Sequence, residues 1–179
     1  MLRPAVLSCL VLLTLTPPAE AAPRQLPQAR QATVQDFAGR EVSMAQWQGR
    51  VLVVNFWASW CGYCIAELPD LVATQKKWSG RGVQVVSLAL GDDADSIVRL
   101  SKRYRINYPV LDGDSANRNW RRSMGVAVSS SQVPLTWVID TDNRVLLRQL
   151  GQVSAQQLDH ALSSSSAARQ AAALPQKKQ

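Results

Sequence analysis

The sequence predicts an α/β domain in which helices flank a central mixed β-sheet. Residues 50–57 are apolar at almost every position, as is typical of a central strand buried on both faces. Strand-like segments alternate with helix-like segments through to residue 163. A hairpin signal at Thr141-Asp142-Asn143 joins the last two strand-like segments. Strands that alternate with helices and end in a hairpin imply a sheet with both parallel and antiparallel strand pairs.

The N-terminal half of this domain begins with residues 33–48, which predict a short hairpin followed by a turn of helix. The central strand leads directly into a predicted helix at 62–78, where apolar residues recur near helical spacing. Pro69 lies inside this helix. Because proline has no N–H and its ring clashes with the preceding turn, we expect a kink there.

The remaining elements alternate in type. They are a strand at 82–90, a helix from Asp92 to about Tyr104, a short strand at 108–111, a helix from Asp114 or Ser115 to about Ser123, strands at 132–140 and 144–149, and a final helix at 153–163 with Leu158 and Leu162 facing inward. No internal repeat is visible in the sequence.

The 179 residues are enough for one domain with its own core. Residues 1–21 are expected to be a secretory signal peptide, because a basic start, a short apolar run and an Ala-x-Ala site follow one another. An uncleaved N-terminal anchor is the alternative, although the run is shorter than the roughly 20 residues of a membrane helix. Residues 22–32 are expected to be a linker, 33–163 the domain, and 164–179 a disordered tail.

The formal net charge of +7 is compatible with acidic partners or proximity to an anionic membrane. A solvated basic surface that aids solubility is the simpler explanation. The sequence contains no nucleic-acid-binding motif and no platform of aromatic and basic residues, so we expect no nucleic-acid partner.

The cysteines are the strongest chemical signal. Cleavage after residue 21 would leave only Cys61 and Cys64, a C-x-x-C pair too close in sequence to stabilise the fold much as a disulfide. A closed zinc site needs about four ligands, and the remaining candidate, His160, lies far away in the last predicted helix. We therefore expect no metal, and we expect His160 to be a surface or packing residue.

Redox chemistry explains the placement of the pair better. The buried strand delivers Cys61 to the start of a helix, where backbone N–H groups and the helix dipole stabilise a thiolate. A thiolate is the nucleophile in disulfide exchange. Cys64 lies one turn later on the same helix face and can close onto Cys61 to release a partner.

Residues 57–64 (WASWCGYC) resemble the active-site motif of the thioredoxin superfamily, and Val133-Pro134 resembles its second hallmark, a cis proline facing the cysteines. The resemblance covers about residues 33–163 and implies the thioredoxin fold, with an N-terminal hairpin and a central βα insert. It implies no cofactor other than the Cys61–Cys64 disulfide. It also implies that Asn55 and Trp57 support the site and that a group of residues contacts the substrate: Trp60, Gly62, Tyr63, Val133 and Pro134.

Within the superfamily the chain resembles the TlpA/ResA-like branch, which includes DsbE/CcmG-like proteins. Asn55 stands where thioredoxin has a buried Asp, and Glu67 follows Cys64 as in the branch motif C-x-x-C-x-x-E-x-P. The resemblance implies that Glu67 accepts the proton of Cys64; the alternative is an acidic residue that merely favours the helix dipole. The serine-rich segment 127–132, after Met124-Gly125-Val126, is longer than usual in the branch.

The expected function is that of an exported thiol–disulfide oxidoreductase that reduces protein disulfides in the periplasm or another extracytoplasmic space. Neither Gly62 nor Tyr63 is cationic, which argues against the strong thiolate stabilisation of an oxidant. The resemblance implies a membrane thiol carrier (DsbD/CcdA-like) as electron donor, and targets such as apocytochrome c, partner oxidoreductases or copper-binding proteins.

Other functions remain as alternatives. They are a disulfide oxidase or isomerase and a non-catalytic metal- or partner-binding module. A peroxidase of the peroxiredoxin type is disfavoured, because Val54 and Ala58 occupy the places of its Pro and Thr/Ser.

Overall fold

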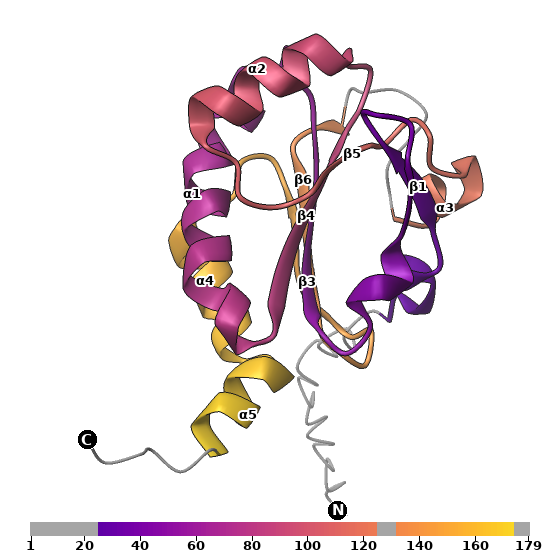
Figure 1. Cartoon of the computed structure of the whole chain (residues 1–179). Helices are drawn as coiled ribbons and strands as arrows, with labels where there is room; N and C mark the ends of the chain where they lie inside the picture. The colour runs from indigo at the N-terminus through magenta and orange to yellow at the C-terminus, as the bar shows by residue number, and fades with distance from the viewer. Residues whose placement is uncertain (1–24, 125–131, 174–179) are drawn as a thin grey trace, which may run out of the picture.

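The computed structural model describes residues 25–124 and 132–173. Within these residues the strands form one seven-stranded sheet in the order β2-β1-β5-β4-β3-β6-β7, with helices packed around it (Figure 1). The β3–β4 and β4–β5 pairs are parallel and the other pairs are antiparallel. The predicted α/β architecture with a mixed sheet is therefore confirmed. The strands are β1 Thr33–Asp36, β2 Glu41–Ser43, β3 Val51–Trp57, β4 Val83–Ala89, β5 Val110–Asp112, β6 Leu135–Ile139 and β7 Val145–Leu150.

Helices cover the sheet, with α1 and α4 side by side on one face (Figure 1). The short helices η1 and η2 pack with α3 on the other face. In the described part of the chain, no helix is both long and apolar enough to span a membrane. The α-helices are α1 Gly62–Trp78, α2 Ala94–Tyr104, α3 Arg118–Ser123, α4 Ala155–Ser163 and α5 Ser166–Ala173, and the 3-10 helices are η1 Pro27–Arg30, η2 Met44–Trp47 and η3 Ser79–Arg81.

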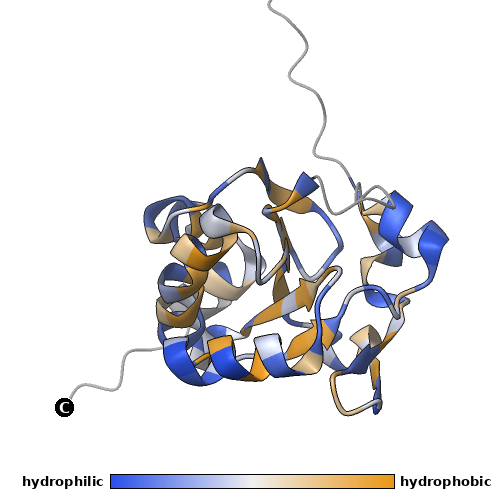
Figure 2. Ribbon diagram, turned by 90° about the horizontal axis from the view of Figure 1, so that it is seen from above, coloured by the Kyte–Doolittle hydropathy of each residue, from blue (hydrophilic) through white to orange (hydrophobic). Residues whose placement is uncertain are grey.

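Strand β3 is buried at every residue, which accounts for its continuous apolar sequence. Its side chains alternate between the two faces: Val51 and Val53 pack in the cluster beneath α1 and α4, whereas Leu52 and Val54 pack in the cluster beneath η1, η2 and α3. Each such burial contributes about 1.5–3 kcal/mol. In Figure 2 the hydrophobic colour is concentrated on the central strands, and most of the hydrophilic colour lies on the outer sides of the helices.

Four residues separate the end of β3 from the start of α1, and the last of them, Cys61, caps the helix with an extended backbone. Lys76 and Lys77 lie in its last turn, where positive charge interacts favourably with the helix dipole. The helix continues through Pro69 as one element, and the kink expected there stays a prediction.

Residues 25–32 belong to the folded domain, which corrects the prediction of a linker over 22–32. Leu26 and Ala29 are buried in the core. The buried Arg30 donates hydrogen bonds to the carbonyl oxygens of Arg50 at 2.5 Å and Asp140 at 3.1 Å. A segment rich in Pro, Gln and Arg thus folds because two of its apolar residues are buried and backbone carbonyl oxygens accept the hydrogen bonds of its buried cation.

The prediction of disorder over 164–179 is likewise corrected for residues 164–173. Helix α5 occupies most of this stretch, and Ala167 is buried against the core beneath α1. The backbone N–H of Ser166 donates to the carboxylate of Asp140 at 3.0 Å, and its hydroxyl also donates to Asp140. This carboxylate therefore anchors the start of α5.

Helix α3 begins at Arg118, after a cap at Asn117, and not after Asp114 or Ser115 as the sequence predicted. The Ser115 hydroxyl donates to the carbonyl oxygen of Asp112 at 2.6 Å. The carboxylate of Asp114 accepts the N–H of Gly91 at 2.5 Å. The side chains of both predicted caps are therefore engaged with other parts of the chain: Ser115 with the end of β5, and Asp114 with the loop that follows β4.

The predicted signal peptide over 1–21 lies outside the described residues. So do Gly125, Val126 and residues 127–131 of the serine-rich segment.

Candidate active site

The two cysteines lie at the start of α1 and are joined by a disulfide. Cys61 keeps 9% of its surface exposed, whereas Cys64 has none. The backbone N–H of Cys64 points to the sulfur of Cys61, with an N–Sγ distance of 3.2 Å. This N–H and the helix dipole are placed to stabilise a thiolate on Cys61 once the disulfide is reduced. Cys61 is thus the sulfur that a partner can reach, and Cys64 is shielded behind it.

The loop before β6 lies against the dithiol. The peptide bond between Val133 and Pro134 is cis, as the resemblance predicted. The carbonyl oxygen of Val133 lies 3.9 Å from the sulfur of Cys61. Pro134 is buried, and its carbonyl oxygen accepts the N–H of Gly151 at 2.8 Å. The end of β7 therefore fixes the loop beside the reactive sulfur.

Two large aromatic side chains beside the dithiol are open to solvent. Trp60 is 57% exposed and Tyr63 is 73% exposed, and Gly62 between the cysteines is exposed as well. Trp57 differs, because it is fully buried and packs in the cluster that contains both cysteines. The surface around Cys61 thus presents aromatic area to a partner, while Trp57 supports the site from below.

Glu67 is fully buried beneath the cysteines, one turn after Cys64 on α1. The side-chain amide of Asn55 donates to its Oε1 at 2.7 Å, and the backbone N–H of Val153 donates to its Oε2 at 2.9 Å. Burial raises the pKa of Glu67 to about 7; the two hydrogen bonds oppose this rise and the charge of Asp70 adds to it. A group with this pKa exchanges a proton readily near neutral pH.

A row of polar residues crosses the central strands beneath Glu67. Asn55 on β3 pairs in register with Ser87 on β4 and with Thr136 on β6, so the three side chains share one face of the sheet. The amide of Asn55 also donates to the hydroxyl of Thr136 at 3.0 Å. Nearby, burial and then the charge of Glu67 raise the pKa of Tyr108. Glu67 therefore sits in a polar environment inside an otherwise apolar core.

A family model described as Redoxin matches residues 24–163. The chain belongs to the Redoxin family. The first residues of its folded domain, which the sequence alone had assigned to a linker, fall inside the match.

Curated relatives of this Redoxin-family chain include thiol-disulfide oxidoreductase ResA of Bacillus subtilis (strain 168). The two are 27% identical over 114 residues, which cover 63% of this chain and 60% of the relative. A ResA of Bacillus cereus is 24% identical over 126 residues, covering 70% of this chain and 69% of the relative. The chain thus spans about 60–70% of the length of these relatives.

Solved structures share the fold. A thiol:disulfide interchange protein of the thioredoxin family from Chlorobium tepidum TLS has a TM-score of 0.66 and 27% identity, covering 82% of this chain and 99% of its own. A secreted Mycobacterium tuberculosis disulfide oxidoreductase has a TM-score of 0.65 and 20% identity, and the match covers 78% of this chain and 99% of that protein. The expected thioredoxin fold is therefore confirmed for this Redoxin-family protein.

The structure brings the cysteines, the Val133-Pro134 loop, Glu67 and Asn55 together at one end of the sheet. His160 lies apart from them, exposed on α4. Among residues 25–124 and 132–173, no three His, Cys, Asp or Glu side chains gather as metal ligands would. What the geometry offers chemically is a reachable sulfur, a shielded second sulfur and a buried carboxyl group.

Sequence reasoning singled out Asn55 but missed the other residues around Glu67. Val153 contributes a backbone N–H, for which a side-chain pattern gives no signal. Ser87 and Thr136 do carry a signal. Thr136 is the one polar residue of β6, and Ser87 is one of two polar residues in the mainly apolar β4. Aligning these two strands with β3 would have placed both beside Asn55.

Proposed function

We propose that this protein is an exported thiol–disulfide oxidoreductase that reduces disulfides of protein substrates. One observation carries the proposal: a reachable cysteine caps helix α1 and is bonded to a fully buried second cysteine. The Redoxin match and the names of the relatives support it.

In the first step the Cys61 thiolate attacks a disulfide of the substrate. A mixed disulfide forms between Cys61 and one substrate sulfur, and the other substrate sulfur leaves as a thiolate. Trp60, Gly62 and Tyr63 surround the point of attack and contact the substrate. The Val133-Pro134 loop contributes the opposite wall.

In the second step Cys64 attacks the sulfur of Cys61, so that the Cys61–Cys64 disulfide forms and the substrate leaves with both sulfurs reduced. Cys64 begins as a buried thiol, and burial disfavours its ionised form. Glu67 takes the proton of Cys64, and it suits this role because its pKa lies near 7 and it follows Cys64 by one helical turn. The substrate thus gains two electrons, and the protein becomes oxidised.

The loop between the cysteines supports this direction of electron flow. Neither Gly62 nor Tyr63 supplies a positive charge that would make the reduced form exceptionally stable. The dithiol is therefore a reductant, and a carrier must reduce it again after each turnover.

The predicted leader at 1–21 supports an extracytoplasmic location such as the periplasm. A membrane thiol carrier of the DsbD/CcdA type supplies the electrons there. The substrates are disulfides of apocytochrome c before haem attachment, or of partner oxidoreductases.

The proposal is tested by trapping in the native compartment with a Cys64→Ser variant. Without the second thiol, the mixed disulfide on Cys61 persists and captures the substrates. A Cys61→Ser/Cys64→Ser variant is the matched control and captures none. If the single variant captures no protein, the exchange mechanism is wrong.

The reduction potential of the dithiol tests the direction. A reductase is expected to have a potential below about −220 mV, whereas a potential near about −120 mV indicates an oxidase.

A further inference from the structure

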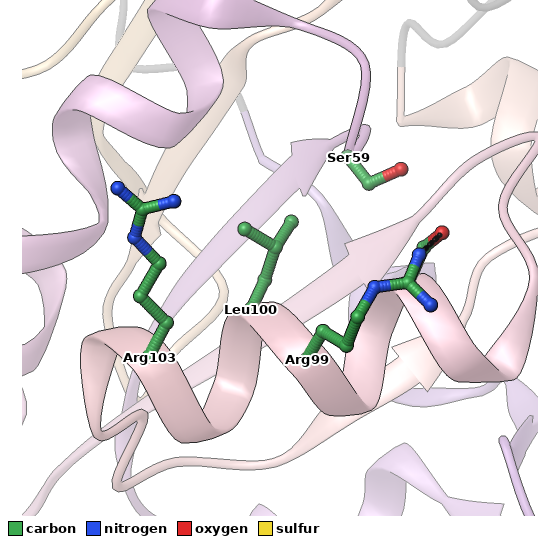
Figure 3. A pocket seen from close by; sticks show the side chains of 5 residues that line it. Ser59, Arg99, Leu100 and Arg103 are labelled. Carbon is green, nitrogen blue, oxygen red and sulfur yellow. Dashed lines mark hydrogen bonds between the residues drawn. The ribbon is translucent and has the colours of Figure 1, made fainter.

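A cavity of about 350 Å³ lies between α2 and the loop that precedes Cys61 (Figure 3). Ser59 in this loop is two residues before Cys61, so their Cα atoms are at most about 7 Å apart. Leu100, on the α2 side, packs against the cluster that contains both cysteines. We call this space the arginine cavity; its lining residues are Ser59, Ser96, Arg99, Leu100 and Arg103.

Two arginines give the cavity its charge. Arg99 and Arg103 are one turn apart on α2, and in Figure 3 both side chains rise from the helix on either side of Leu100. Both are exposed, and neither forms an ion pair within residues 25–124 and 132–173. Each guanidinium carries five N–H donors, so most of these donors remain available.

The contacts that the two guanidiniums do make are few. Arg99 donates one hydrogen bond to the hydroxyl of Ser96 at 2.8 Å. The guanidinium carbon of Arg103 lies 5.6 Å from the ring centroid of Tyr104. Neither contact neutralises a charge.

Two aspartates at the start of α2 lie beside the cavity, and their carboxylates accept hydrogen bonds from Ser59 and Ser96, which line it. Asp92 accepts the backbone N–H of Ser59 at 2.9 Å and also the Ser59 hydroxyl. Asp93 caps α2 and accepts the N–H and hydroxyl of Ser96 at 2.8 and 2.7 Å. Hydrogen bonds from Ser96 lower the pKa of Asp93, and the charge of Arg99 adds to this effect. Because both serine hydroxyls already donate, the arginines supply the free donors at the cavity.

We propose that the arginine cavity binds the carboxylates of acidic side chains that flank the disulfide of a polypeptide substrate. This inference rests on the proposed function. A guanidinium pairs with a carboxylate through two parallel N–H···O bonds, which makes arginine well suited to this recognition. A polypeptide whose disulfide reaches Cys61 must lie across the exposed surface around Trp60, and Ser59 joins that surface to the cavity. The net charge of +7 favours the approach of an acidic segment.

The test uses two cyclic peptides that each contain one internal disulfide and differ only beside the cysteines, with two Glu in one and two Gln in the other. The full chain is reduced first and mixed with each peptide, and the peptide thiols formed are measured by chromatography after acid quenching. Reduction of one peptide disulfide yields two peptide thiols and one Cys61–Cys64 disulfide. At low ionic strength we expect the Glu peptide to be reduced about fivefold faster than the Gln peptide, which is the effect of one exposed ion pair. This difference in rate should shrink as salt is added, because salt screens the charges.

An Arg99→Gln/Arg103→Gln variant should bring the ratio of the two rates close to one. A Lys76→Gln/Lys102→Gln variant removes the same charge from residues that do not line the cavity, and it should keep the ratio. The proposal is overturned if wild type shows no preference, or if both variants lose it equally, because the preference then reflects overall charge. Glutathione disulfide serves as a third substrate. The proposal is also overturned if the arginine variant reduces glutathione disulfide more slowly than wild type does but reduces both peptides at the wild-type rates, which would indicate a site for small anions. Failure to reduce either peptide would instead count against the proposed function.

Discussion

Glu67 and Asp140 are two carboxylates with almost no exposed surface, 0% and 1% respectively. Glu67 receives hydrogen bonds from Asn55 and from the backbone of Val153, and neither donor is charged. Burial dominates its electrostatics, so its pKa rises to about 7. A proton can therefore bind and leave near neutral pH.

Asp140 has a richer set of donors. The backbone and hydroxyl of Ser166 and the backbone of Thr141 donate to it, and the guanidinium groups of Arg144 and Arg169 lie within 3.0 and 3.5 Å. Burial acts to raise the pKa of Asp140, but the hydrogen bonds from Ser166, Thr141 and Arg144 together lower it below its usual value. This carboxylate stays ionised and holds the β6–β7 turn to the start of α5.

The comparison teaches that burial alone does not decide what a carboxylate does. The two donors of Glu67 leave it able to take up a proton, whereas the hydrogen bonds that Ser166, Thr141 and Arg144 donate together hold the pKa of Asp140 below its usual value. The first arrangement suits proton transfer beside a dithiol. The second suits a structural junction.

The largest expected effect comes from Asp140→Asn. Removing the anion weakens several charge-assisted hydrogen bonds at once, from Ser166, Thr141 and Arg144. It also removes a negative charge near the buried Arg30. We therefore expect the free energy of unfolding to fall by about 4 kcal/mol, measured by urea denaturation at pH 7.

Asp159→Asn is the control. Asp159 pairs with Lys77 at the surface, and the amide oxygen of an asparagine can still accept the indole N–H of Trp78, so only the ion pair is lost, at about 1 kcal/mol or less. Equal losses in the two variants would contradict the structural role of Asp140.

The next effect is a pH dependence of stability that Glu67 imposes. Its pKa rises on folding from 4.5 to about 7, so the folded state binds the proton more tightly and stability falls as the pH rises through this range. The loss is about 3 kcal/mol between pH 4.5 and 8. Glu67→Gln lacks this component. Urea denaturation should therefore show that the free energy of unfolding of the variant increases relative to that of wild type as the pH rises. A difference that is constant with pH would show that Glu67 titrates normally.

A smaller effect is expected for Asn55→Ala. The lost hydrogen bond stabilises the charged form of Glu67 by about 1.5 kcal/mol, so the pKa of Glu67 should move further above 7. Thr136→Val is the control, since Thr136 contacts Asn55 and not Glu67. The titration of the Glu67 carboxyl carbon by NMR reports both variants, and an unchanged midpoint in Asn55→Ala would argue that the amide does not tune this group.

The fold could be predicted where the pattern of apolar residues within a segment determines its secondary structure. The apolar run of β3 and the helix that follows it could be located from the sequence because each buries a continuous face. Helix α5 and the segment around Arg30 could not, because residues distant in the sequence hold them: the carboxylate of Asp140 for α5, and the carbonyl oxygens of Arg50 and Asp140 for Arg30. Hydrogen bonds between distant residues leave no local apolar pattern in the sequence.

The site was predictable to a similar extent. Cys61, Cys64 and the Val133-Pro134 loop are recognisable from their motifs, and Glu67 from its spacing. The environment of Glu67 was not, because a backbone N–H and the register of neighbouring strands create it.

The central claim is that Glu67 takes the proton of Cys64 in the second step. Reduced protein mixed with DTNB should release two thiolates in sequence, the first on attack by Cys61 and the second when Cys64 closes the disulfide. For wild type we expect the rate of the second release to depend on a group that titrates near pH 7. In Glu67→Gln this release should slow by about 100-fold and lose that dependence, while the first is unaffected. A second release with the same rate and pH profile in both proteins would contradict the account.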